Sequence, residues 1–430
     1  MYFKKLLIVT VLILSSVVSR SQESFRDTVS VSLTKSDSLF VTQNLALLAE
    51  RCNIDAARAQ VIQARLFKNL NFSITENAFN PYYQTMNSKK WFDFTDKGEM
   101  QIQVQKLFLL AGKRNKQIEL AESGALKEEQ LYFDLLRTLR YSLHSQFYNI
   151  YFLSRTLKMY ETEINSLSKL EIAFENEAGK GLVSKKELLR IKATLFSMEN
   201  ERLGYFTQLI AAENEFNILM HTSGIFYKPS LPAGSVTSFS PGNFRIQQLI
   251  DTANRCRYDL KMAQTDFNSS TINLSYQKSL AVPDLTVSGG WDRNGSYYHN
   301  FNYVGLMFDL PFFDRNQGNI KSARFNMESS KYRVISAEDQ VKADVISAFT
   351  NAVETDKLYQ KFDKGFLDDL DQMNTEMLRN YEKKNISLIE FLDYYDAYKT
   401  NVIQYNNLMF SRLNSFENIN FAVGKELITQ

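Results

Sequence analysis

The sequence has 430 residues, among them 50 Lys and Arg, 48 Asp and Glu, three His and two Cys. Its formal charge of +2 becomes −1 without residues 1–21, because that segment contains Lys4, Lys5 and Arg20 and no acidic residue. A chain so close to neutral lacks the basic surface that nucleic-acid binding requires, so the composition argues against a nucleic-acid partner.

The N-terminus predicts a secretory signal peptide over residues 1–21. A basic start is followed by the mainly apolar run Leu6–Val18 and by small residues suited to a cleavage site. Beyond this segment, no uninterrupted apolar run approaches the roughly 20 residues that a membrane-spanning helix needs. If the exported chain enters a membrane, we expect it to do so with strands.

The first half, residues 22–220, predicts strands near 70–83 and 98–109. In the second strand glutamines alternate with apolar residues, namely Gln101, Gln103 and Gln105 with Ile102 and Val104. Successive side chains of a strand point to opposite faces, and a row of glutamines facing an apolar core would be costly. We therefore predict that the glutamines face a water-filled lumen and that Ile102 and Val104 face lipid.

Long helices are predicted wherever proline is absent, over much of residues 82–228 and 312–430. Apolar residues recur there every three or four positions, as in coiled coils. One such row is Leu136, Leu139, Leu143, Phe147, Ile150, Leu153, Leu157, Tyr160, Ile164 and Leu167. The other is Leu388, Phe391, Tyr395, Tyr398, Val402, Tyr405, Met409, Leu413 and Phe416. A helix from about 113 to 177 would be about 100 Å long.

Two turns are predicted between these helices. Ser184 with Glu187, and Ser387 with Glu390, have the spacing of a capping box, which starts a new helix. Each turn therefore joins two long antiparallel helices.

The second half, residues 244–430, repeats this scheme after a linker over 221–243, which contains three of the six prolines. Its strands are predicted near 284–293 and 301–310. In the latter strand, the apolar residues assigned to the lipid face are Val304, Leu306 and Phe308. Cys52 and Cys256 occupy matching places in the two halves. They can either form a disulfide or pack as two small side chains.

Four strands cannot close a membrane barrel, and an open sheet edge is not viable in lipid. The chain must therefore combine its strands with those of further copies. Two copies would supply about eight strands, which enclose little more than side chains, whereas three would supply about twelve and leave an aqueous path. This favours at least a trimer of identical chains.

These features resemble the TolC-type outer-membrane efflux proteins over nearly the whole chain after the signal peptide. The most specific segments are Leu110–Arg114, Pro283–Thr286 and Val304–Ile320, and the last resembles the CzcC-like heavy-metal branch. The resemblance implies a mainly α fold with membrane β-strands: two repeats, each of long coiled-coil helices plus a β-hairpin. It also implies a trimeric 12-stranded β-barrel in the outer membrane, continued by a periplasmic α-helical barrel.

The resemblance places the periplasmic tip at the two helix turns, where a membrane-fusion adaptor would dock. The tip residues are Gly181, Leu182, Val183, Ser184, Asn385, Ile386, Ser387 and Leu388. The residues of the strand-to-helix motif are Pro311, Asp314, Arg315, Asn316 and Gly318. Their own chemistry is structural: Pro311 ends strand pairing, Asp314 or Asn316 can cap the following helix, and Gly318 gives a bend room.

No catalytic, cofactor or metal site is predicted. His144, His221 and His299 lack the spacing of metal ligands, and no phosphate-binding loop or nucleophile elbow is present in the sequence. The predicted function is the exit duct of a tripartite efflux system, carrying heavy-metal cations or drugs from an inner-membrane pump of the RND rather than the ABC type. The alternatives are the duct of a type I protein secretion system and, in another class, a soluble periplasmic coiled-coil scaffold.

Overall fold

The computed structural model describes residues 27–76, 99–180, 182–222, 225–231, 240–293, 298–362 and 365–427. These residues form two compact units, each of which combines segments from both halves of the chain. The unit that we call the helical unit contains the chain up to Ala49, Phe133–Arg257 and the chain from Gln340 onward. The sheet unit contains Glu50–Tyr132 and Tyr258–Asp339. The units do not coincide with the two predicted repeats, whose boundaries stay a prediction.

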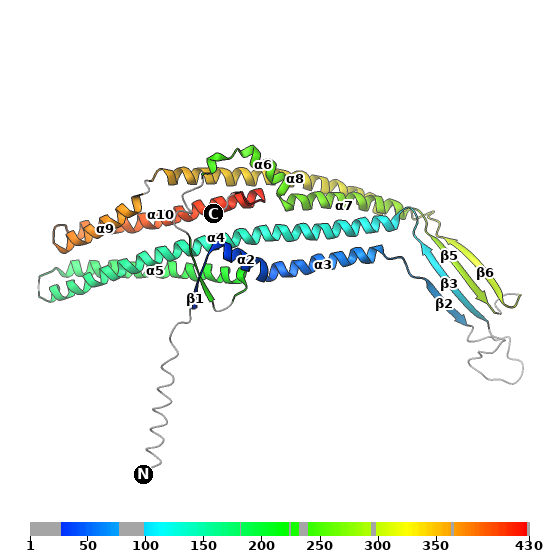
Figure 1. The fold of residues 1–430 in the computed structure, drawn as a ribbon, viewed down its shortest axis with the longest axis horizontal. Coiled ribbons are helices and arrows are strands. Elements are labelled where there is room, and N and C mark those ends of the chain that lie inside the picture. Colours follow the sequence, from blue (N-terminus) through cyan, green and yellow to red (C-terminus); the bar gives the residue numbers. More distant parts are fainter. Residues whose placement is uncertain are drawn as a thin grey trace, which may run out of the picture. The chain divides into compact units, whose positions relative to one another are not determined.

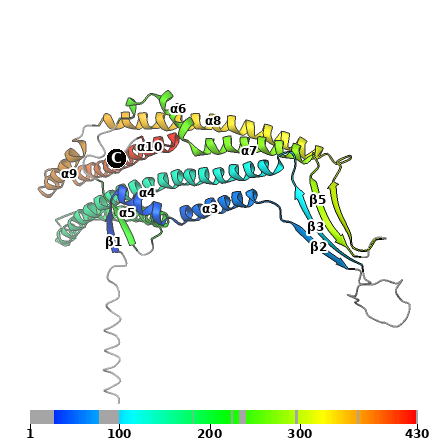
Figure 2. The same cartoon turned by 45° about the vertical axis from the view of Figure 1, so that its right-hand side comes forward.

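The sheet unit is built on four antiparallel strands in the spatial order β2–β3–β5–β6 (Figures 1 and 2). Their bounds are Asn71–Glu76 for β2, Met100–Phe108 for β3, Leu285–Asp292 for β5 and Phe301–Phe308 for β6. The β3–β5 pairing joins the strands of the first half to those of the second. The predicted continuation of β2 toward residue 83 lies outside the described residues.

A long helix precedes or follows each of the four strands of this sheet. The bounds are Leu45–Arg65 for α3, Lys113–Gly179 for α4, Tyr258–Leu280 for α7 and Gln317–Gln360 for α8. Within the sheet unit, polar contacts join neighbouring helices: Arg58–Glu129 at 2.6 Å, Lys127–Asp266 at 2.7 Å and Ser270–Ser330 at 2.9 Å. The helices therefore lie in the order α3–α4–α7–α8, which is the order of the strands that they continue.

The helical unit contains the rest of α4 and α8 together with shorter elements. These are β1 (Asp27–Val31), α2 (Leu33–Gln43), α5 (Lys185–Met220), β4 (Ile225–Pro229), the 3₁₀ turn η3 (Pro241–Asn243), α6 (Ile246–Cys256), α9 (Phe366–Glu382) and α10 (Leu388–Val423). β1 and β4 form a parallel pair. No helix in the described part of the chain combines the length and hydropathy of a membrane span.

Both predicted apolar rows form the core of the helical unit. In α4 the eight residues from Leu143 to Leu167 are buried, and in α10 the whole row is buried except the half-buried Tyr405. Tyr160, Ile191, Leu370 and Phe391 meet in one cluster that joins α4, α5, α9 and α10. The fold predicted for the chain, long packed helices with strands in each half, is confirmed.

Three details differ from the sequence analysis. The predicted linker over 221–243 contains β4, because Ile225 and Tyr227 are good strand formers that pack inward beside β1. The proline-free stretch after residue 312 is interrupted before Gly365, the residue that precedes α9. Cys52 and Cys256 are both free thiols, so the disulfide left open by the sequence is not present.

Candidate functional site

The sheet has one polar and one apolar face. Opposed residues of antiparallel strands point to the same side, so the register decides which side chains share a face. One face contains Asn71, Ser73, Thr75, Gln101, Gln103, Gln105, Thr286, Ser288, Gly290, Asp292, Tyr303 and Gly305, with the apolar Leu107, Phe301 and Met307 only near its two ends. The other contains Phe72, Ile74, Ile102, Val104, Lys106, Phe108, Leu285, Val287, Val304, Leu306 and Phe308. The predicted glutamine row and the predicted apolar residues thus lie on opposite faces.

The polar face is held by contacts between the two halves of the chain. The side-chain amide of Gln101 donates to the hydroxyl of Tyr303 across 2.9 Å. The Tyr303 ring lies over Gly290, where an added Cβ would come within 2.5 Å of the ring. The glycine therefore leaves room for this tyrosine, because a Cβ at residue 290 would shift the ring from its place beside the glutamine row.

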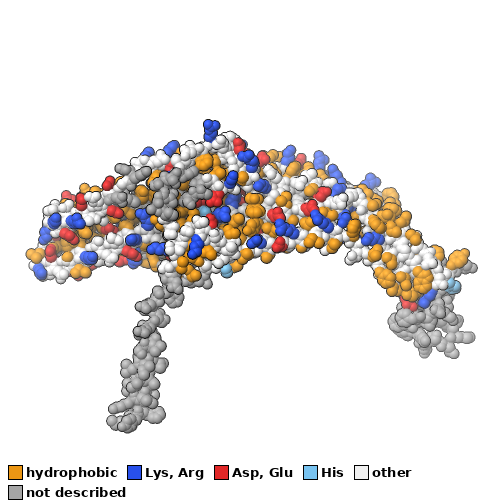
Figure 3. Space-filling model, in the orientation of Figure 1, with side chains coloured by type: hydrophobic (Ala, Val, Ile, Leu, Met, Phe, Trp, Pro, Cys, Tyr) orange, Lys and Arg blue, Asp and Glu red, His pale blue; other side chains and the backbone are white. Residues whose placement is uncertain are grey.

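The apolar face is exposed. Val304 is 83% accessible, and Phe72, Ile74, Leu306 and Phe308 are also exposed. In Figure 3 hydrophobic side chains gather over the region of the strands. A contiguous apolar surface of this kind marks a site of contact with lipid or protein, because water solvates it poorly.

The strand-to-helix motif of the second half forms a tight junction. Strand pairing ends at Phe308, three residues before Pro311, and Asp314 accepts a hydrogen bond from the backbone N–H of Asn316 at 2.8 Å. Asn316 has a φ of +57°, and its side-chain amide donates to the backbone oxygen of Gln277 in α7 at 2.8 Å.

The roles of two motif residues differ from the prediction. Gly318 lies in the first turn of α8, whereas the left-handed backbone conformation of the bend is at Asn316. The Asn316 amide also joins α8 to α7 instead of capping α8. Arg315 is exposed, and its backbone N–H donates to the Gln317 side chain at 2.8 Å.

At the corresponding junction of the first half, an ion pair between a buried lysine and a half-buried aspartate joins the two halves. The Lys113 ammonium lies 2.7 Å from the Asp284 carboxylate and donates to the Val282 carbonyl at 2.7 Å. Asp284 also accepts from the backbone N–H of Leu110 at 2.9 Å. Both partners belong to the segments that carry the family resemblance, but only the tertiary structure shows that they meet.

The two predicted helix turns lie at the same end of the helical unit. The Lys384 ammonium, from the turn between α9 and α10, is 3.9 Å from the carboxylate of Glu177 at the end of α4. Both predicted capping boxes are present, Ser184 with Glu187 and Ser387 with Glu390. These caps fix where α5 and α10 begin and hence the shape of the turns.

The predicted tip residues differ in their accessibility. Leu182 is 70% exposed, whereas Leu388 is buried and Ile386 packs against the core cluster. Val183 is half-buried, Asn385 makes a backbone hydrogen bond to Asn380, and Gly181 lies outside the described residues. Leu182 is therefore the apolar tip residue most available to a partner.

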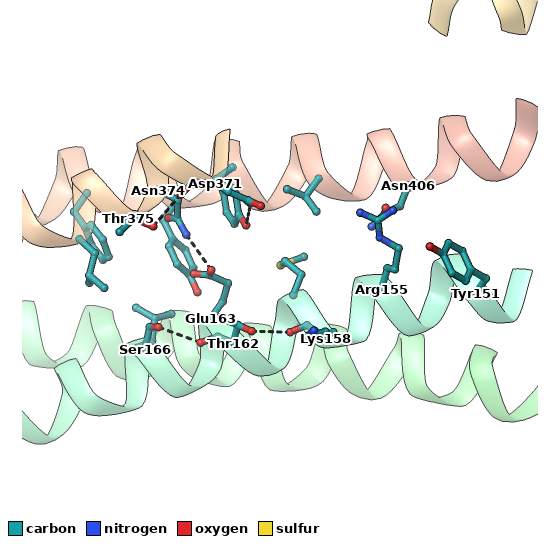
Figure 4. A pocket seen from close by; sticks show the side chains of 17 residues that line it. Tyr151, Arg155, Lys158, Thr162, Glu163, Ser166, Asp371, Asn374, Thr375 and Asn406 are labelled. Carbon is teal, nitrogen blue, oxygen red and sulfur yellow. Dashed lines mark hydrogen bonds between the residues drawn. The ribbon is translucent and has the colours of Figure 1, made fainter. Parts of the chain in front are cut away.

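A polar cavity of about 580 Å³ lies between α4 on one side and α9 and α10 on the other (Figure 4). Glu163 is buried there and accepts a hydrogen bond from the Asn374 side chain at 2.9 Å, and burial raises the pKa of this carboxyl. The Tyr398 hydroxyl donates to Asp371 at 2.7 Å. These contacts link helices from both halves of the chain. In the part of the chain that is described, no group of three metal-ligating side chains is present.

A buried histidine joins α2, α4 and α10. His144 Nε2 is 3.1 Å from Asp37, and Nδ1 is 3.1 Å from Glu417. Arg140 lies 3.4 Å from Asp37, and the Tyr148 hydroxyl donates to Glu417 at 3.3 Å. Burial lowers the pKa of His144, but the bonds to the two carboxylates outweigh it and raise this pKa from 6.5 to about 9.

This raised pKa predicts that stability falls at alkaline pH. The folded state binds the His144 proton more tightly than the unfolded chain, so the stabilisation is complete below pH 6.5 and is lost as pH rises through about 9. The full effect is about 3 kcal/mol. Urea unfolding between pH 6 and 10 measures it, with His144→Gln as the comparison. If His144→Gln lost as much stability between pH 6 and 10 as the wild type, other groups would be responsible.

Comparison with known proteins agrees with the fold. No protein-family model matches the sequence. The chain is 21% identical over 287 residues to the cobalt-zinc-cadmium resistance protein CzcC of Cupriavidus metallidurans, over 66% of this chain and 64% of CzcC. The match thus covers slightly less than two thirds of that relative.

Solved structures match over a greater length. A membrane protein from Pseudomonas aeruginosa superposes with a TM-score of 0.74 at 15% identity, over 91% of this chain and 90% of that one. The outer-membrane channel OprN gives a TM-score of 0.71 at 13% identity, over 91% and 89%. The chain therefore has the fold of these two proteins, one of which is an outer-membrane channel, and the match to CzcC agrees with the family resemblance predicted from the sequence.

Proposed function

We propose that the chain is a passive outer-membrane exit duct that acts as a homotrimer. The observation that carries this proposal is the four-stranded sheet with a polar face, an exposed apolar face and two outer strands, β2 and β6. In lipid those outer edges must pair with further strands. Three copies would supply about twelve strands, with the glutamine row lining the lumen and the apolar face contacting lipid.

The experiment that tests this proposal is extraction of the full chain from outer-membrane fractions. We expect a heat-modifiable trimer in gel electrophoresis and discrete conductance steps in planar bilayers. A chain recovered as a soluble periplasmic monomer would contradict the proposal and favour the scaffold.

Heavy-metal cations are the proposed cargo. The support is the match to CzcC, a cobalt-zinc-cadmium resistance protein. Drugs are the alternative cargo that the sequence resemblance implies. An inner-membrane pump of the RND type would supply the energy and a periplasmic adaptor would connect it to the duct. Cobalt, zinc and cadmium tolerance of cells with and without the gene measures the cargo, and unchanged tolerance to all three would contradict this assignment.

The adaptor is proposed to dock at the helix turns, with Leu182 as its main apolar contact. Leu182→Asp is expected to weaken copurification of the adaptor about thirtyfold, because a charge would have to be buried in the interface. Leu358→Asp, at an exposed leucine of α8, is the matched control. Both variants should still form trimers, and equal adaptor recovery with both would remove Leu182 from the docking surface.

A further inference from the structure

The apolar face of the sheet contains one lysine. Lys106 lies opposite Val287, which lies opposite Leu306, and along β3 it stands between Val104 and Phe108. A charged side chain in such a row is costly in lipid unless its ammonium reaches the membrane surface. Lys106 is two residues from the end of β3, so its long side chain can reach that surface.

A second cation lies beside it. The Arg114 guanidinium is 4.0 Å from the centre of the Phe67 ring, and the Lys106 ammonium is 6.0 Å from the same centre. Phe67 is 71% exposed. The two charges therefore share one aromatic side chain at the edge where the strands meet the helices.

Two other basic residues at this edge, Arg65 and Lys113, are paired with carboxylates. Arg65 lies 2.6 Å from Glu122, and Lys113 lies 2.7 Å from Asp284. Arg114 donates to the backbone oxygen of Arg65, and within the described residues neither Lys106 nor Arg114 has an ion-pair partner. This corner of the sheet unit consequently carries an unneutralised positive charge.

Exposed apolar side chains lie at the same end of the strands. Leu66, Phe67 and Leu70 precede β2, and Leu310, Phe312 and Phe313 follow β6, with Phe313 96% exposed. Aromatic residues next to basic ones are typical of the level of lipid headgroups, where the ring enters the acyl region and the charge stays with the phosphates.

The opposite end of the apolar face also ends in charge. Glu76, paired with Met100 across the β2–β3 ladder, lies 4.0 Å from Arg293. The six residue steps from Met100 to Lys106 span about 20 Å along the strand. Apolar bands of outer-membrane barrels are about 25 Å tall, so the apolar stretch between the two charged ends fits within one such band.

We propose that Lys106 and Arg114 bind the phosphate of a phospholipid headgroup in the periplasmic leaflet, with Phe67 against its acyl chains. The inference rests on the proposed membrane insertion and adds a lipid site to it. An anionic phospholipid fits best, because its phosphate charge is not offset by a cationic headgroup as it is in phosphatidylcholine.

The experiment reconstitutes the full chain into phosphatidylcholine vesicles containing a fraction of phosphatidylglycerol and then extracts it with mild detergent. Native mass spectrometry counts the phosphatidylglycerol molecules retained per chain. In the Lys106→Gln, Arg114→Gln double variant, each removed charge is expected to weaken the binding of phosphatidylglycerol about fivefold. The Lys331→Gln, Arg333→Gln variant has the same charge change on an exposed face of α8 and should behave like the wild type.

Insertion is measured first, by flotation of the vesicles, which separates the two proposals. If the wild type does not insert, the proposed function fails and the lipid site fails with it. If the wild type and both variants insert but retain the lipid equally, only the lipid site is refuted. Release of the bound lipid by millimolar inorganic phosphate would also refute it, since the site would then be one for soluble anions.

Discussion

Replacing Val104 by arginine is expected to abolish most membrane assembly of the chain. Val104 lies in the middle of β3 on the apolar face, opposite Phe72 in β2 and Gly289 in β5. An arginine at the bilayer midplane on the lipid side of a barrel costs about 2–4 kcal/mol. The yield of heat-modifiable trimer in outer-membrane fractions measures the effect. Phe308→Arg, near the end of β6, should reduce this yield less than Val104→Arg.

Gln103→Arg is the matched control, because residue 103 is adjacent in the strand but points to the polar face. We expect normal trimer yield and a changed ion selectivity in planar bilayers. If the two variants assembled equally well, the assignment of the faces would be wrong. If Gln103→Arg were the defective one, the faces would be reversed.

Removing the Arg412 side chain is expected to destabilise the helical unit by about 3–5 kcal/mol. Arg412 and Asp356 lie 2.8 Å apart with side chains only 2% and 4% exposed, and the guanidinium stacks 4.2 Å from the Tyr359 ring. Arg412→Met leaves the Asp356 carboxylate buried without its cation. Urea unfolding of the detergent-solubilised chain at neutral pH measures the loss.

The double variant Arg412→Met, Asp356→Asn tests the mechanism. An asparagine keeps an oxygen that accepts from Ser240 and Gln360, which contact Asp356 at 3.0 and 2.7 Å, but it carries no charge. We therefore expect the double variant to recover more than half of the lost stability. A double variant as unstable as Arg412→Met would show that lost packing of the arginine, rather than the unpaired charge, is responsible.

Much of the fold was predictable because its signals are local. The spacing of Leu143, Phe147 and Ile150 identifies the buried side of α4 without knowledge of its partners, since helix geometry alone brings these residues to one face. The capping boxes at Ser184 and Ser387 likewise involve residues three positions apart. The alternation of Gln101 to Gln105 identifies two faces in the same way.

The site residues that the sequence did not reveal depend on contacts over long sequence distances. His144 meets Asp37 and Glu417, and no local pattern marks this arrangement. The same holds for Lys113 with Asp284, and for Lys106 and Arg114 around the ring of Phe67. A pair of charges gives no periodic signal, so its partner is known only once the chain has folded.

By itself the sequence determined the class of elements, the two turns and the opposite character of the two strand faces, because each follows from side-chain periodicity or from caps within one turn. Only the tertiary structure decided that β3 pairs with β5, that Leu388 is buried while Leu182 is exposed, and that β4 interrupts the expected linker. Those outcomes depend on packing between distant segments, whose free energy is a sum over many contacts that no single stretch of sequence contains.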